Sequence, residues 1–208
     1  MWIYQKQLQH PVKIARPNPR LASLIITALG GPDGETGAAM RYLNQRYTMP
    51  DGKVVGILTD VGTEEMGHQE MVSSIVYQLT RNLTPDEIIA GGFDKYYVEN
   101  GAAIYPASAS GVPFNAASIA SKEDALASIH EDLAAEQKAR AMYDNILRLS
   151  DDPDVNDAIK FLRQREIVHF QRFGEALRIV QDHLDSRNFF IMNPAFDQGV
   201  MNEKECGC

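Results

Sequence analysis

The sequence predicts an all-α protein: a four-helix bundle with one long crossover connection and an extension at each end. Four long stretches carry apolar residues at the alternating three- and four-residue spacing of helices packed in a bundle. Between the second and the third lies a connection, about residues 82–121, that is rich in Gly, Ser, Ala and Pro and matches a long crossover. We expect the bundle over residues 18–185, an N-terminal arm over 1–17 and a C-terminal tail over 186–208.

The four helical stretches are expected at about residues 18–47, 51–81, 122–150 and 153–185. The segment Gly30-Gly-Pro-Asp-Gly34 interrupts the first stretch, because glycine and proline kink or break a helix. Short polar turns at Asp51-Gly52 and at Ser150-Asp-Asp-Pro-Asp154 predict two helical hairpins, and Asp152 is placed to cap the helix that begins at Pro153.

Both extensions are expected to pack on neighbouring subunits rather than to form a core of their own. Cys206 and Cys208 are the only cysteines in the chain, so no disulfide framework holds the fold. These two cysteines are candidates for binding a soft metal or for cross-linking chains, and an inert tail is the alternative.

Composition excludes several classes of partner. The 208-residue chain is long enough for one buried core, and no composition shift divides it into independently folding halves. Its net charge of −8 would repel nucleic acid and anionic membrane surfaces, so neither is expected as a partner. No signal peptide and no transmembrane segment can be identified. We expect a protein that is made and kept in the cytosol and that acts on a small molecule or on another protein.

Glu65-Met-Gly-His68 and Glu166-Ile-Val-His169 are two copies of Glu-x-x-His, each inside a helical stretch. A helix brings residues i and i+3 onto one face, so each copy presents a carboxylate and an imidazole together, as a divalent transition metal requires. Chance would place about 0.3 such pairs in a chain of this composition. The repetition therefore predicts a two-metal site.

Two further glutamates share the apolar seams of the bundle. Glu136 lies midway along the third stretch, and Glu35 follows the interruption of the first, with Ala38, Ala39 and Tyr42 at helical steps after it. A Glu from each of two helices and Glu-x-x-His from each of the other two form the ligand set of di-iron and di-manganese carboxylate bundles. Spacing alone predicts six metal ligands: Glu35, Glu65, His68, Glu136, Glu166 and His169.

Four carboxylates and two imidazoles in an apolar seam require cations, because buried charges must be paired or coordinated. Carboxylates can bridge two metal ions that lie about 3.5–4 Å apart, which lets the pair share the two electrons of a peroxide reaction. The predicted site therefore indicates oxygen or peroxide chemistry.

Other polar residues have more ordinary interpretations. Tyr42 either fills the core or bonds a metal ligand through its hydroxyl group. Arg140 falls on the seam of the third stretch, or beside it if Ala139 faces inward. Surface or ordinary polar contacts are expected for the remaining histidines, His10, His130 and His183. Solvated positions are expected for Glu64, Glu70 and Glu131.

With these residues in place, the sequence resembles the manganese catalases, and most closely the short spore-coat branch of that family. The likeness runs over about residues 1–182, and the combined motifs are far more specific than Glu-x-x-His alone. The matching stretches are Met1-Trp-Ile-Tyr, Gly31-Pro-Asp-Gly-Glu35, Tyr42-Leu-Asn-Gln-Arg-Tyr, Thr63-Glu-Glu-Met-Gly-His68, Ala134-Ala-Glu136-Gln-Lys-Ala-Arg140, Arg165-Glu-Ile-Val-His169 and Gln171-Arg-Phe.

The resemblance implies a ferritin-like bundle with two manganese ions per subunit, which dismutates hydrogen peroxide to water and dioxygen. The manganese pair would cycle between the Mn(II) and the Mn(III) states. At the matching positions, the resemblance implies that Glu35 and His68 bind one manganese ion, Glu136 and His169 bind the other, and Glu65 bridges the two.

For Glu166 the resemblance implies a role that differs from the one suggested by spacing: an outer-sphere carboxylate that handles protons. It also implies a homo-oligomer, commonly a hexamer, and an association with the spore coat and its other proteins. Ala135 departs from those family members that carry an arginine at this position, and this departure bears on the gating of the peroxide channel and on the ionisation of Glu166. The chain also lacks the long C-terminal segment of the larger catalases.

Two rival interpretations remain at the level of sequence. A non-haem di-iron protein of the ferritin or rubrerythrin kind would use almost the same ligands. The ligand set does not exclude it, since manganese binds more weakly than iron at most such sites. A rubrerythrin would also need a Cys-x-x-Cys module, which this chain lacks. The second rival is a structural coat protein in which the metal site only stabilises the bundle.

Overall fold

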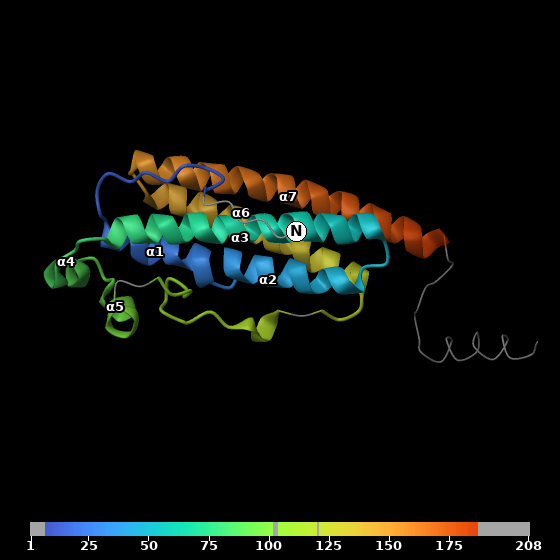
Figure 1. Ribbon diagram of the computed structural model, residues 1–208, viewed down its shortest axis with the longest axis horizontal. Coiled ribbons are helices and arrows are strands. Elements are labelled where there is room, and N and C mark those ends of the chain that lie inside the picture. Colours follow the sequence, from blue (N-terminus) through green and yellow to red (C-terminus); the bar gives the residue numbers. More distant parts are fainter. Residues whose placement is uncertain (1–6, 102–103, 120, 187–208) are drawn as a thin grey trace, which may run out of the picture.

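The computed structural model describes residues 7–101, 104–119 and 121–186, and over these residues the chain is helical, as the sequence predicts (Figure 1). An isolated antiparallel bridge pairs Ala107 with Pro113. The α-helices are α1 (Pro19–Gly30), α2 (Glu35–Gln45), α3 (Gly52–Thr80), α4 (Pro85–Ala90), α5 (Asp94–Asn100), α6 (Ala125–Leu149) and α7 (Pro153–Ser186), and the 3-10 turns are η1 (Arg46–Thr48) and η2 (Ala116–Ser118).

The rods of the bundle are α3, α6, α7 and the pair α1 and α2 (Figure 1). Helices α1 and α2 lie end to end as one rod and run antiparallel to α3, while α6 and α7 form the second antiparallel pair. The connection from α3 to α6 returns along the side of the α1–α2 rod, so that α3 and α6 run parallel. This arrangement is the predicted bundle with one long crossover.

The first rod is broken at the Gly–Pro segment, where the sequence predicts a kink or a break. Helix α1 ends at Gly30, and α2 begins at Glu35 after the N-cap residue Gly34. The crossover packs tightly against this break: a Cβ atom on Gly30 would lie 2.3 Å from the backbone nitrogen of Ala107. The break therefore places Glu35 in the first turn of a new helix.

Polar side chains cap the starts of the other bundle helices, as helix starts require. The carboxylate of Asp152 accepts hydrogen bonds from the backbone N–H groups of Asp154 and Val155, which confirms its predicted role. The remaining caps are Asn18 on α1, Asp51 on α3 and Asp124 on α6.

The crossover contains two short helices that the sequence analysis did not predict. Helix α4 begins with a capping box, in which the hydroxyl of Thr84 and the carboxylate of Glu87 satisfy each other's backbone N–H groups. The hydroxyl of Tyr96, on α5, donates to the carbonyl oxygens of Ser108 and Ala109. Tertiary contacts thus order a segment whose composition resembles that of a loop.

The described part of the N-terminal arm, residues 7–17, packs on the bundle of its own chain, contrary to our expectation of a neighbouring subunit. Val12 and Ile14 are buried in the core. The side-chain amide of Gln78, on α3, bonds the carbonyl oxygen of Val12 and the N–H of Ile14. Residues 1–6 and the C-terminal tail with Cys206 and Cys208 lie outside the described residues.

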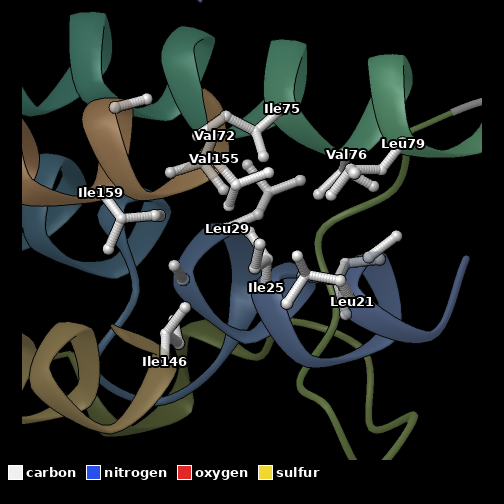
Figure 2. Close-up of a cluster of buried hydrophobic side chains, with 14 of the residues drawn as sticks. Leu21, Ile25, Leu29, Val72, Ile75, Val76, Leu79, Ile146, Val155 and Ile159 are labelled. Carbon is white, nitrogen blue, oxygen red and sulfur yellow. The ribbon is translucent and has the colours of Figure 1, made fainter. Parts of the chain in front are cut away.

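Apolar side chains form two clusters along the bundle. The first lies between α1, α3, α6 and α7 and contains Leu29, Val72 and Ile159 (Figure 2). The second lies toward α2 and contains Leu58, Ile129 and Phe173. Each of α3, α6 and α7 contributes to both clusters, so a short segment of each helix lies between them. No helix in the described part of the chain is long and apolar enough to cross a membrane.

Candidate metal centre

The six residues predicted as ligands meet between the two apolar clusters. They come from the four rods of the bundle, and none of them is more than 2% exposed. Glu35 begins α2, Glu136 lies midway along α6, and the two Glu-x-x-His motifs lie on α3 and α7. The helical spacing of three residues does bring each glutamate and its histidine to the same buried face.

Glu65 lies between the two imidazoles. Its Oε2 is 2.7 Å from Nδ1 of His68, and its Oε1 is 2.8 Å from Nδ1 of His169. The two rings stack with their centroids 5.4 Å apart and their planes inclined by 22°. One carboxylate therefore contacts Nδ1 of both histidines, which is the arrangement that a bridging ligand needs.

Three further carboxylates surround this centre. Oε2 of Glu35 lies 3.8 Å from Nδ1 of His68, and Oε2 of Glu136 lies 3.5 Å from Nδ1 of His169. Oε1 of Glu166 lies 4.0 Å from Nδ1 of His68. One ligand atom from each residue of the two Glu-x-x-His motifs falls within 4.8 Å of the other three, which is close enough to share metal ions.

The opposite side of both imidazoles faces Glu64, which we expected to be solvated. Its side chain is only 15% exposed, because it lies between α3 and α7. Its Oε1 is 3.5 Å from Nε2 of His68, and its Oε2 is 3.2 Å from Nε2 of His169. Arg165 holds the same carboxylate with two hydrogen bonds, of 2.6 Å and 3.2 Å, and Gln9 of the N-terminal arm adds a third, of 2.7 Å.

Two buried tyrosines border the centre. The hydroxyl of Tyr143 donates a hydrogen bond to Oε1 of Glu35. Tyr42 is 1% exposed and packs edge-on against Phe173, and burial together with the charge of Glu136 raises the pKa of its hydroxyl. Tyr42 was a candidate site residue from the sequence, whereas Tyr143 was not predicted as part of the site. Its position two turns after Glu136 was the available signal.

Electrostatics at the centre favour an anionic Glu65 between cationic imidazoles when no metal is bound. Burial opposes the charged form of each imidazole, but the surrounding carboxylates, of which Glu65 acts most strongly, together outweigh this effect and raise the pKa of His68 to about 10 and that of His169 to about 12. Burial likewise disfavours ionised Glu65, yet the two imidazolium groups hold its pKa well below the usual range.

The other three carboxylates respond in the opposite direction. Burial, reinforced by the negative charge of Glu65, raises the pKa of Glu35, Glu136 and Glu166 above the usual range for a glutamate. Two imidazoles do not supply enough positive charge to keep four buried carboxylates ionised. Additional cations would supply it.

This donor set fits a pair of transition-metal ions. Both carboxylate oxygens of Glu136 and Oε1 of Glu166 are buried and accept no hydrogen bond within the described residues. Oxygen and imidazole donors suit manganese, iron and zinc, and the absence of thiolates disfavours copper(I). A carboxylate that addresses two imidazoles fits two ions better than one.

Residues outside the centre largely have structural roles. His10 bonds Asp157 at 2.7 Å and stacks on Phe161, in agreement with the expected polar contact. Ala139, not Arg140, faces inward on α6. His130 and Glu70 are exposed, and His183 is partly buried.

Near Glu136, the α6 seam carries polar contacts that the sequence analysis missed. Glu131 is not simply solvated, because it accepts hydrogen bonds from Arg41 at 3.0 Å and from Gln45 at 2.9 Å. Its neighbour Asp132 is fully buried one turn before Glu136, and burial raises the pKa of its carboxyl group. The step of four residues from Glu136 was the available signal.

Comparisons with known proteins agree with this geometry. The family model described as "Manganese containing catalase" matches residues 1–193. Protein CotJC of Bacillus subtilis (strain 168) is 50% identical over 190 residues, which are 91% of this chain and 100% of that protein. A probable manganese catalase of Clostridium acetobutylicum is 32% identical over 193 residues, which are 92% of this chain and 86% of that protein.

The fold agrees as well. The crystal structure of KatB, a manganese catalase from Anabaena, superimposes with a TM-score of 0.80 at 27% sequence identity, covering 93% of this chain and 87% of that one. The family match therefore spans the four helices, the break before Glu35 and the buried carboxylate–imidazole cluster. This chain belongs to the manganese-containing catalase family.

Proposed function

We propose that this protein is a catalase that converts two molecules of hydrogen peroxide into two of water and one of dioxygen at a dinuclear manganese centre. The observation that carries the proposal is the position of Glu65, whose two oxygens lie 2.7 Å and 2.8 Å from Nδ1 of His68 and of His169. The likeness to a probable manganese catalase of Clostridium acetobutylicum and to a manganese catalase from Anabaena supports the choice of metal.

In this proposal the ligands divide between two manganese ions. Glu35 and His68 would hold one ion, Glu136 and His169 would hold the other, and Glu65 would bind both. The pair of ions would supply a redox couple that accepts two electrons from one peroxide molecule and returns them to the next. The apolar clusters on both sides hold the six ligands in place and limit the access of water.

Glu166 is proposed to move protons. Reduction of peroxide to two water molecules consumes two protons, and oxidation of a second peroxide to dioxygen releases two, so a group nearby must give and take them. Burial and the surrounding carboxylates raise the pKa of Glu166 well above the usual range, which favours the protonated form of its carboxyl group. Its Oε1 accepts no hydrogen bond within the described residues and is free for this exchange.

Two measurements on purified protein test the catalase proposal. Elemental analysis should find close to two manganese ions per chain, and an oxygen electrode should record dioxygen release from peroxide that cyanide does not inhibit, as expected without haem. Iron in place of manganese with peroxide consumption but no dioxygen would indicate the di-iron alternative. Stoichiometric metal without turnover would indicate a structural coat protein, and zinc or less than half a metal ion per chain would contradict a redox site.

We further propose a homo-oligomer, with a hexamer expected from the family resemblance, and an association with the spore coat. The resemblance to the spore-coat branch and the 50% identity with CotJC support this association. Light scattering of the purified protein measures the number of subunits. Immunodetection in spore fractions tests the location, and a protein found only in vegetative cytosol would contradict it.

A further inference from the structure

Glu64 lies against both imidazoles, in a position that no ligand assignment explains. It precedes the bridging residue Glu65 on α3, but its carboxylate lies on the outer side of both rings. Its Oε1 faces Nε2 of His68 and its Oε2 faces Nε2 of His169, at 3.5 Å and 3.2 Å. Adjacent residues of one helix thus place one carboxylate on each side of the same pair of rings.

The chemistry of a metal-bound imidazole explains why a carboxylate would lie at this position. When Nδ1 of a neutral imidazole binds a metal ion, the remaining proton is on Nε2, and that N–H needs an acceptor. An acceptor at this position fixes the tautomer, limits rotation of the ring and increases the basicity of the metal-bound nitrogen. Glu64 offers one carboxylate oxygen to each ring, so a single side chain can serve both histidines.

Glu64 is itself firmly held. The guanidinium group of Arg165, one residue before Glu166 on α7, binds it with two hydrogen bonds and compensates its charge. Gln9, from the N-terminal arm, donates to Oε1 at 2.7 Å. Contacts from α7 and from the N-terminal arm therefore fix a carboxylate that would be solvated on an isolated helix.

We propose that Glu64 is a positioning residue that orients both His68 and His169, with Nδ1 directed at the metal centre, and that Arg165 and Gln9 hold Glu64 in place. The proposal rests on the proposed dinuclear metal site. It assigns to one side chain outside the ligand set a symmetrical role toward both metal ions.

The two oxygens of Glu64 allow a selective test. Glu64→Gln keeps one acceptor oxygen but presents an N–H₂ group to the second imidazole, whereas Glu64→Ala removes both acceptors. Titration with Mn(II), followed by the electron paramagnetic resonance of the free ion, should show two comparable sites in the unsubstituted protein. Glu64→Gln should weaken one of the two sites selectively, and Glu64→Ala should weaken both by about 10- to 100-fold.

A second readout needs no metal. In metal-free protein labelled with ¹⁵N-histidine, the Nε2–H protons of His68 and His169 should exchange slowly with water because Glu64 shields and binds them. Glu64→Ala should speed the exchange of both protons, and Glu64→Gln that of one. Glu70→Gln is the matched control, since it removes the same charge from an exposed position on the same helix and should leave both readouts unchanged.

The possible outcomes separate the two proposals. Unchanged Mn(II) affinity and unchanged exchange in Glu64→Ala, with a native circular dichroism spectrum, would refute the positioning role while leaving the dinuclear site intact. If Glu64→Gln and Glu70→Gln weakened Mn(II) binding at both sites equally, the change in net charge would explain the effect. That result would also refute the positioning role. If the unsubstituted protein binds no Mn(II), the proposed function fails, and the exchange measurement alone decides whether Glu64 orients the imidazoles.

Discussion

At the scale of single residues, the centre depends on unequal roles for chemically identical side chains. Four buried glutamates lie within one site, yet the pKa of Glu65 is lowered whereas the pKa values of Glu35, Glu136 and Glu166 are raised. The difference has a geometric cause, because only Glu65 lies within 3 Å of both imidazoles. Environments that push like groups apart in pKa often mark different roles in a reaction.

Glu65 and Glu166 are expected to respond differently to loss of charge. Glu65→Gln removes the bridging charge between the two histidines, so it should abolish the binding of at least one manganese ion. Glu166→Gln keeps the shape of the side chain but cannot transfer a proton, so it should retain two metal ions and lose about 10²- to 10⁴-fold in turnover. Metal content and dioxygen release on the same preparations measure both effects. Equal metal loss in the two variants would make Glu166 a ligand, as spacing alone suggests.

The sequence predicted partners on one helix better than partners on different helices. The three-residue step of a helix fixes the pairing of Glu65 with His68 before any tertiary structure is known. By contrast, Tyr143 meets Glu35 across 108 residues of sequence, and nothing in the local pattern encodes this contact. Glu64 was expected in solvent because carboxylates mostly are, and its burial depends on Arg165 from a helix 101 residues away.

At the scale of elements, the bundle helices were predictable for two reasons. Their apolar residues recur at a regular helical spacing, and turn or capping residues precede their first turns. The boundaries expected for α3, α6 and α7 lie within a few residues of those observed. Helices α4 and α5 escaped prediction, since six or seven residues are too few to display a period. The break between α1 and α2 followed from local glycine and proline chemistry, but its close contact with Ala107 could not be predicted locally.

Two glycines of α3 should respond oppositely to alanine. A Cβ atom on Gly62 would lie 2.9 Å from Cγ of Leu43, so Gly62→Ala should push α2 away from α3 and lower the free energy of unfolding by about 1–3 kcal/mol. Gly56 is exposed and meets nothing within 4 Å, so Gly56→Ala should stabilise the helix by about 0.5–1 kcal/mol. Chemical unfolding measures both effects. Because α2 carries Glu35, Gly62→Ala should also weaken metal binding, and a stabilised Gly62→Ala variant would contradict the close packing of α2 on α3.

At the scale of the whole molecule, the metal centre interrupts what would otherwise be a continuous apolar core. The clusters that contain Val72 and Leu58 lie on opposite sides of it, and α3, α6 and α7 pass through both. Because the same helices carry both the apolar core and the ligands, loss of the metal ions should lower the stability of the whole bundle. Folding and metal binding are then linked equilibria, each of which changes the other.

This linkage predicts that metal-loaded and metal-free protein respond oppositely to pH. Without metal, the pKa values of His68 and His169 are raised to about 10 and about 12, and those of Glu35, Glu136 and Glu166 are raised as well. A raised pKa contributes stability that is fully present below the unfolded value and is lost as pH rises toward the folded value. The lowered pKa of Glu65 acts in the other direction, but its contribution is already complete above about pH 4.5.

Metal-free protein should therefore lose stability as pH rises from about 5 to about 9, whereas metal ions, which displace the same protons, bind more tightly over this range. At a metal concentration about 1,000 times Kd, each site adds about 4 kcal/mol, so Tm should rise by roughly 8–16 °C per site. Scanning calorimetry with and without Mn(II) at pH 6 and at pH 8.5 tests this, and the gap in Tm should widen at the higher pH. A gap that narrows as pH rises would mean that the metal ions do not compete with protons for these ligands, and the buried cluster would then not be the metal site.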